Sequence, residues 1–86
     1  MSEISRFYGI VIKMFFDDHE PPHFHVEYAE HQAVVSIETV ALIGGTLPPR
    51  ALGLVAEWAA LRQEELREAW QRAKNLEPVD RIDPLP

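Results

Sequence analysis

The chain has 86 residues, no cysteine and a formal net charge of −6, from eight lysines and arginines against fourteen aspartates and glutamates. This length suits one small domain, the missing cysteines exclude disulfides and thiolate metal sites, and the acidic balance disfavours direct binding to a nucleic-acid backbone. No apolar run approaches the ~20 residues of a membrane helix and the N-terminus lacks the order of a secretory signal, so we expect a cytoplasmic protein.

Apolar and β-branched residues predict an antiparallel sheet in the first half of the chain. Residues 6–16 form the central strand in this interpretation, with their apolar side chains on one face. Residues 23–28 and 33–38 predict two further strands, and residues 40–43 predict a short fourth one. Because every connection is too short for a parallel crossover, the predicted topology is an antiparallel meander.

One long C-terminal helix is predicted to follow the strands. It begins near Pro48 or Pro49, where the missing backbone donor of proline costs nothing, and ends at about Lys74. Its apolar side chains form one broad arc that should cover the core face of the sheet. Arg62 falls near the middle of that arc, so its charge must either reach a carboxylate at the rim or point at a ligand or partner.

The last residues of the chain predict an extended arm. Residues 76–86 carry three prolines with apolar residues between them, which argues against helix. Apolar side chains on such an arm need a groove, in this chain, in a second copy or in a different protein. The predicted fold class is therefore α+β: a three- to four-stranded antiparallel meander packed under one long helix, with one domain over residues 1–75 and an arm over residues 76–86.

Residues 17–27 concentrate the chemistry of the chain, with three of its four histidines and four carboxylates. On a strand, His23, His25 and Glu27 share one face, and the two histidine Cα atoms lie about 6.5–7 Å apart. Both imidazoles can then reach one metal ion, and Glu27 can supply a third ligand. This set predicts a divalent metal such as zinc, manganese or iron in a hydrolytic or oxidative role.

Two other interpretations of the same segment stay open. The histidines can instead be exposed strand residues that hold the turn through hydrogen bonds to Asp17, Asp18 or a backbone carbonyl, or the face can be a docking surface for another protein. His19 lies in the turn and can join either arrangement. A histidine acid and base pair working with Asp18, and with Arg6 or Arg62 as an anion clamp, is also feasible for phosphodiester cleavage. The candidate catalytic residues are therefore His23, His25, Asp18, His19 and Arg62.

Several stretches together resemble a known family. These are residues 4–12, residues 16–19 and residues 21–26, which include Asp18-His19 and Pro21-Pro22-His23-Phe24-His25, followed by residues 47–52 and the helix around Trp58. The chain resembles the bacterial domain of unknown function 4160. The resemblance implies a short stand-alone cytoplasmic protein, commonly encoded beside another small protein, in modules like those of toxins and antitoxins. No catalytic or metal-binding residue comes with it.

Two functions follow as expectations. The leading one is a protein-binding component of a toxin-antitoxin-like module, whose arm and histidine face engage a small protein encoded by a neighbouring gene or a second copy of the chain. The alternative is a metal- or histidine-dependent hydrolase, such as a ribonuclease toxin, that uses the face formed by His23, His25 and Glu27.

Overall fold

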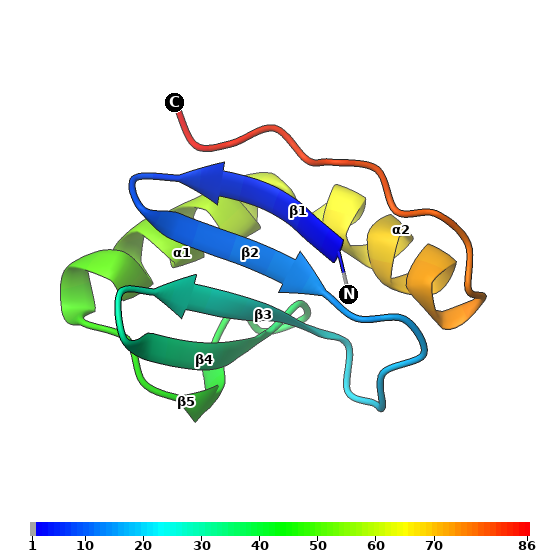
Figure 1. The fold of residues 1–86 in the computed structure, drawn as a ribbon, viewed down its shortest axis with the longest axis horizontal. Helices are drawn as coiled ribbons and strands as arrows, with labels where there is room; N and C mark the ends of the chain where they lie inside the picture. The colour runs from blue at the N-terminus through cyan, green and yellow to red at the C-terminus, as the bar shows by residue number, and fades with distance from the viewer. Residues whose placement is uncertain (1) are drawn as a thin grey trace.

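Five strands precede two helices in the computed structural model, which describes residues 2–86 (Figure 1). The elements are β1 (Ser2–Phe7), β2 (Ile10–Met14), β3 (His23–Tyr28), β4 (His31–Ser36), β5 (Leu42–Gly45), α1 (Pro49–Leu61) and α2 (Gln63–Lys74). The strands form one sheet in the order β1-β2-β3-β4-β5, and every neighbouring pair is antiparallel. The α+β class and the antiparallel meander are confirmed, whereas the predicted number of strands and the single long helix are wrong.

The first correction concerns the predicted strand over residues 6–16, which is a hairpin of β1 and β2. Tyr8 and Gly9 have φ angles of 51° and 80°, so both lie in the left-handed region. Such a two-residue turn matches the twist of the flanking strands and pairs Phe7 with Ile10. The turn lacks the usual Asn-Gly signal, so the apolar pattern runs through it unbroken. The short strand predicted at residues 40–43 is present but shifted, as β5.

The second correction concerns the predicted long helix, which is interrupted at Arg62. Arg62 has φ −113° and ψ 20°, outside the helical range, and its backbone N–H still bonds to the oxygens of Trp58 and Ala59. No proline or glycine marks the break, so periodicity alone does not detect it. The Arg62 side chain lies 3.4 Å from the Glu65 carboxylate, which fits the expectation of a charge that reaches the rim.

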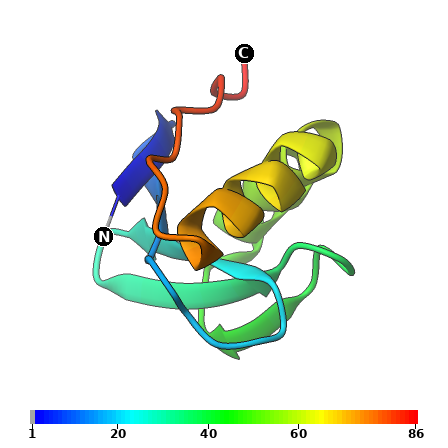
Figure 2. The same ribbon diagram turned by 90° about the vertical axis from the view of Figure 1, so that its right-hand side faces the viewer.

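The core lies between one face of the sheet and the two helices, which form a second layer on that face (Figure 2). Trp58 of α1 packs against Phe7 and Phe24, with ring centroids 5.4 and 5.8 Å apart. The largest buried side chains are Trp58, Trp70, Phe24, Ile4, Ile10, Ile12, Met14, Ile37 and Leu66. Neither helix covers the opposite face of the sheet (Figure 1). No helix within residues 2–86 has the length and apolar character needed to cross a membrane.

The arm runs along the free edge of β1 (Figure 1). Its Ile82 and Leu85 side chains are buried, and the Ile82 N–H donates to the backbone oxygen of Ile4 at 2.7 Å. Trp58 Nε1 donates to the backbone oxygen of Asp83 at 2.8 Å, and the Tyr8 hydroxyl bonds to the oxygen of Pro86. The groove that the arm requires is therefore present in the chain itself.

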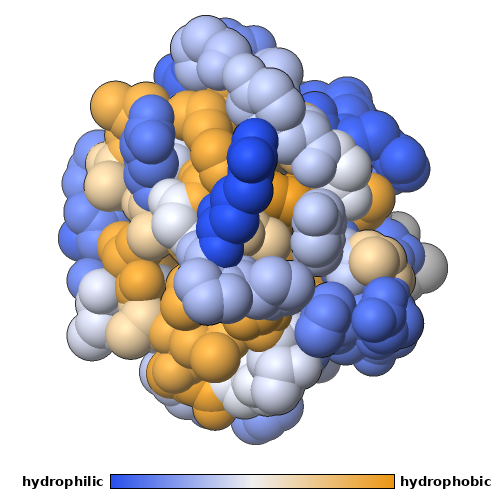
Figure 3. All heavy atoms as spheres, turned by 90° about the vertical axis from the view of Figure 1, so that its left-hand side faces the viewer, coloured by the Kyte–Doolittle hydropathy of each residue, from blue (hydrophilic) through white to orange (hydrophobic). Residues whose placement is uncertain are grey.

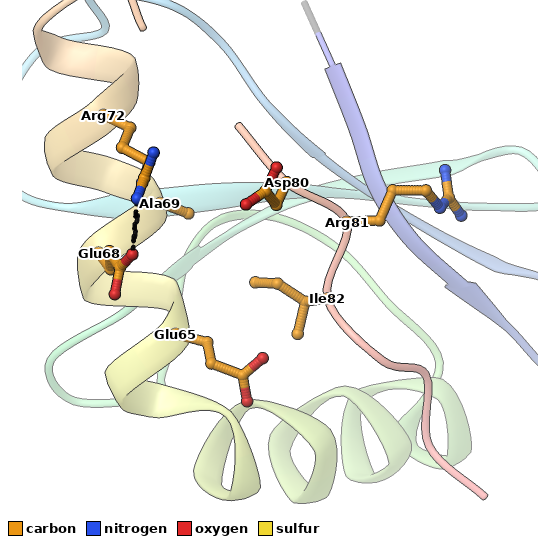
Figure 4. A pocket seen from close by; sticks show the side chains of 7 residues that line it. All are labelled: Glu65, Glu68, Ala69, Arg72, Asp80, Arg81 and Ile82. Carbon is orange, nitrogen blue, oxygen red and sulfur yellow. Dashed lines mark hydrogen bonds and ion pairs between the residues drawn. The ribbon is translucent and has the colours of Figure 1, made fainter. Parts of the chain in front are cut away.

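A mixed-charge hollow of about 210 Å³ separates the arm from α2 (Figure 4). The Ile82 side chain extends from the arm into the space next to α2. The Arg81 side chain points toward β1 instead, where it pairs with Glu3 at 3.2 Å. Arg72 bonds to Glu68 along α2. The charged groups around this hollow largely pair with one another or with β1.

Candidate metal centre at the β2–β3 loop

The loop between β2 and β3 folds back onto the end of α2. The backbone N–H of Asp17 donates to the oxygen of Ala73 at 3.0 Å, and Lys74 Nζ donates to the backbone oxygen of Asp18 at 3.3 Å. Asp17 has a φ of 52°, and the bond between Glu20 and Pro21 is cis. This path places the Asp18 carboxylate over the first residues of β3.

His23 begins β3 and is only 4% exposed. Its Nδ1 lies 2.7 Å from the backbone oxygen of Pro21, and its Nε2 lies 2.9 Å from Asp18 Oδ2. A carbonyl oxygen can only accept, so Nδ1 carries a proton and donates it there. The ring also packs against Trp70 of α2, with centroids 5.1 Å apart. The Nε2 atom of His23 is thus fixed toward Asp18.

His25 approaches the same carboxylate oxygen from the next position on that side of the strand. Its Nε2 lies 3.1 Å from Asp18 Oδ2, and Phe15 stacks on its ring at 4.1 Å. His19 engages the other carboxylate oxygen, with its backbone N–H and its Nδ1 each 2.9 Å from Asp18 Oδ1. The His19 side chain is 89% exposed, so it covers the solvent side of the cluster.

Hydrogen bonding keeps the Asp18 carboxyl ionised. Burial raises its pKa, but the hydrogen bonds from His25, from the backbone and ring of His19 and from His23 outweigh this effect and hold the pKa well below its usual range. A neutral imidazole carries only one N–H. Because His23 already uses Nδ1–H on Pro21, its Nε2 can face the carboxylate only if a second proton or a metal ion lies between them.

Three potential ligand atoms therefore converge at the cluster. One carboxylate oxygen of Asp18 and one ring nitrogen each of His23 and His25 lie within 4.8 Å of one another. Ligands held about 2.0–2.1 Å from a tetrahedral zinc ion are themselves roughly 3.3 Å apart, so small side-chain rotations would admit the ion. The Pro21 carbonyl already provides the outer hydrogen bond that orients a metal-binding histidine.

The other predicted site residues lie elsewhere. Glu27 pairs with Lys13 at 2.9 Å and is not part of the three-residue group, in which Asp18 takes the place expected for Glu27. Arg62 pairs with Glu65, and Arg6 pairs with Glu3. The structure thus brings together four of the five catalytic candidates but places neither proposed anion clamp in hydrogen-bond contact with them within residues 2–86.

The sequence predicts a backbone carbonyl as one alternative partner of the histidines but does not identify Pro21, and it does not indicate the contact with Trp70. The sequence predicts a role for Asp18 in catalysis or in holding the turn but not as a metal ligand, although its spacing to His23 and His25 is visible in the sequence. The turn geometry that folds Asp18 over β3 could not be read from that spacing. Trp70 is far away in the chain and gave no signal of contact with the histidines.

The opposite end of the molecule carries different groups (Figure 3). The β1–β2 and β3–β4 turns and the first turn of α1 meet there, and hydrophobic areas alternate with polar ones. Tyr8, Tyr28, Arg50 and Leu54 line a shallow hollow of about 310 Å³ at this end. No group of metal-ligating side chains lies at this end, and within residues 2–86 the one such group is the cluster at the β2–β3 loop.

Comparison with known proteins places this cluster inside a family. The family described as a domain of unknown function, DUF4160, matches residues 9–71, which include Asp18, His23 and His25 but not the arm. No curated protein and no solved structure matches the chain. The match spans most of the sequence, and the chain belongs to the DUF4160 family.

Proposed function

We propose that the protein binds a divalent transition metal ion through Nε2 of His23, Nε2 of His25 and a carboxylate oxygen of Asp18, and uses it for hydrolysis. The observation that carries this proposal is the convergence of three ligand atoms while Nδ1 of His23 is already bonded to Pro21. A preformed acceptor for the second ring nitrogen is typical of metal-binding histidines.

The ligand set favours hydrolytic chemistry. Two imidazoles and one carboxylate leave at least one coordination position for water, and zinc in such a site lowers the pKa of bound water to about 7. His25 is partly exposed and His19 is largely exposed, so water and a substrate can reach the cluster. His19 is also close enough to the site to exchange a proton with a reacting group.

A metal-independent ribonuclease receives less support. That mechanism needs a cationic side chain to stabilise a phosphate in the transition state. Arg6 and Arg62 both pair with carboxylates of their own neighbourhood, and the chain is acidic overall. The cluster itself supplies histidines but no arginine, and the ammonium group of the nearby Lys74 is bonded to the backbone oxygen of Asp18.

Calorimetric titration with zinc, manganese and ferrous iron at neutral pH tests the metal site. We expect micromolar or tighter binding of at least one metal, lost in the double variant His23→Ala/His25→Ala and in Asp18→Asn. His31→Ala is the matched histidine control and Glu27→Gln the matched carboxylate control, and both should bind like the unmodified protein. Circular dichroism confirms that each variant is folded.

Two results of this titration would overturn the proposed metal site. Absence of binding to the unmodified protein, or binding that the folded double variant retains, rules out the site. Loss of binding in Glu27→Gln but not in Asp18→Asn would instead favour the ligand set predicted from the sequence alone.

A second candidate function is binding to another protein, as a component of a toxin-antitoxin-like module. The sheet face without helices supports it, because an open face beside the histidine cluster is accessible to a partner. The arm is a less suitable docking element, since its Ile82 and Leu85 are already buried against the rest of the chain. Co-purification with the product of the neighbouring gene tests this function, and its absence at stoichiometric expression contradicts it.

A further inference from the structure

A groove lies on the open face of the sheet, directly beside the cluster of Asp18, His23 and His25. Its volume is about 440 Å³, and it is lined by side chains of β3 and β4, by Gly45 of β5 and by Phe15 of the β2–β3 loop. His25 belongs both to the groove and to the candidate metal site. Whatever occupies the groove therefore lies next to the cluster.

Two neighbouring glycines in β5 differ in what requires them. Gly45 has a φ of 72°, and a Cβ there would lie 2.1 Å from the backbone oxygen of Gln32, so the fold demands glycine. A Cβ on Gly44 would lie 3.6 Å from the nearest Val34 atoms, an ordinary contact, and the Gly44 backbone is outside the left-handed region. Nothing in the packing requires glycine at Gly44.

The missing side chain at Gly44 keeps the surface over Val34 open. Glycine weakens a strand interior and often marks a position where a ligand or another backbone comes close. Val34 and Gly44 are cross-strand partners, and Val34 lines the groove. A side chain at this position would contact Val34, whose side chain lines the groove.

The charge around the groove indicates the kind of occupant. Glu27 is the charged carboxylate of the lining, and no lysine or arginine lines the groove among residues 2–86. In its pair with Lys13, Glu27 is the more exposed partner, with 43% of its side chain exposed against 19%. With a net charge of −6, the whole chain also attracts cations and repels phosphates.

We propose that this groove binds a basic peptide segment of a partner protein, with an apolar side chain placed over Phe15, Val34 and Gly44 and a lysine or arginine beside Glu27. Apolar contact supplies affinity, and the carboxylate supplies selectivity. This inference rests on the protein-binding function proposed above and names the chemistry of the partner. It does not depend on metal binding.

Fluorescence anisotropy with short labelled peptides tests the groove. The probes are a peptide of alternating lysine and leucine, a matched peptide of alternating glutamate and leucine, and a short oligouridine. We expect the lysine peptide to bind at least about tenfold more tightly than the other two. Gly44→Val should weaken that binding at least about tenfold because its side chain would cover Val34, which lines the groove, and Glu27→Gln should reduce the preference for lysine over glutamate.

Gly53→Ala is the matched control, since Gly53 is exposed on α1 and a Cβ there meets no atom within 4 Å. Its binding should equal that of the unmodified protein. Unchanged binding in folded Gly44→Val, or stronger binding of the glutamate peptide or the oligouridine, overturns the inference. If Gly44→Val also retains a co-purifying neighbouring-gene product, the protein-binding function stands and only the groove is excluded.

Discussion

Asp18 and Glu3 are two carboxylates whose pKa values are lowered for different reasons. Arg6 and Arg81 hold the pKa of Glu3 at about 2 through hydrogen bonds and charge, against a smaller effect of burial. Imidazoles and a backbone N–H lower the pKa of Asp18 despite its burial, and its side chain is only 15% exposed. Arginine stays charged throughout the accessible pH range, whereas histidine changes charge near neutral pH.

The comparison shows that the β2–β3 loop and the arm are attached to the rest of the chain in different ways. The β2–β3 loop is held by hydrogen bonds between the Asp18 carboxylate and the imidazoles of His23 and His25, at a position where a metal ion could replace the bridging protons. The arm is held mainly by buried apolar side chains, and the ion pairs of Glu3 lie outside them in contact with solvent. Substitutions in the two regions should therefore differ in size and in dependence on salt and pH.

The largest effect should come from the apolar anchors of the arm. We expect Ile82→Ala combined with Leu85→Ala to lower the free energy of unfolding by about 3–5 kcal/mol, because each change removes buried methyl groups and leaves a cavity. Urea denaturation followed by tryptophan fluorescence measures it, since Trp58 bonds to the arm. Pro84→Ala, at an exposed position, is the control. A loss below about 1 kcal/mol would show that the arm is not anchored by these residues.

A smaller loss should follow from Asp18→Asn. The asparagine amide carries no negative charge to offer the nearly buried His23 imidazole, which lies 2.9 Å from Asp18 Oδ2, so we expect a loss of about 1–3 kcal/mol. Urea denaturation at neutral pH measures it. The exposed neighbouring variant Asp17→Asn should leave stability almost unchanged. Equal stabilities of the two variants would contradict the role given to the cluster.

The pH dependence should separate the two carboxylates further. Both have folded-state pKa values below their unfolded values, so each stabilises the fold above about pH 4 and loses that effect as the pH falls toward 2. High salt should weaken the contribution of Glu3, whose arginine partners are exposed, but leave most of that of Asp18. The measurement is the free energy of unfolding across this pH range, at low and at high salt. It compares the unmodified protein with Asp18→Asn and Glu3→Gln and so gives the contribution of each carboxylate. The reverse salt dependence would refute the distinction.

The smallest effect should come from Glu3→Gln at neutral pH. Its arginine partners are more than half exposed, so solvent and salt screen the pairs. We expect a small drop in the urea midpoint at low salt and no change beyond experimental error at high salt. A clear destabilisation that persists at high salt would mean that this network contributes to holding the arm.

The sequence predicted much of the fold because its main signals are local. Alternating apolar residues and short connections are sufficient for an antiparallel meander, and the prolines of residues 76–86 are sufficient for an extended arm. The hairpin was not predicted because its turn carries glycine without the usual preceding Asn or Asp, and the break at Arg62 was not predicted because no proline or glycine marks it.

The candidate site shows the same limit. Alternation on β3 correctly put His23 and His25 on one side, but it could not tell which carboxylate completes the group. Glu27 lies opposite Val11 on β2 and forms an ion pair with nearby Lys13. The β2–β3 loop, in contrast, folds back and places Asp18 against the histidines. Cross-strand register and loop path decide between the two carboxylates, and neither follows from residue spacing.

The arm also affects how the chain behaves while it is being synthesised. Ile4 and Ile82 are joined by a backbone hydrogen bond although 78 positions separate them, and the arm follows every strand and helix in chain order. A nascent chain that has not yet released the arm from the ribosome therefore presents β1 as an uncovered strand edge. Such edges pair readily with other chains, so truncated translation products should aggregate more than the full sequence.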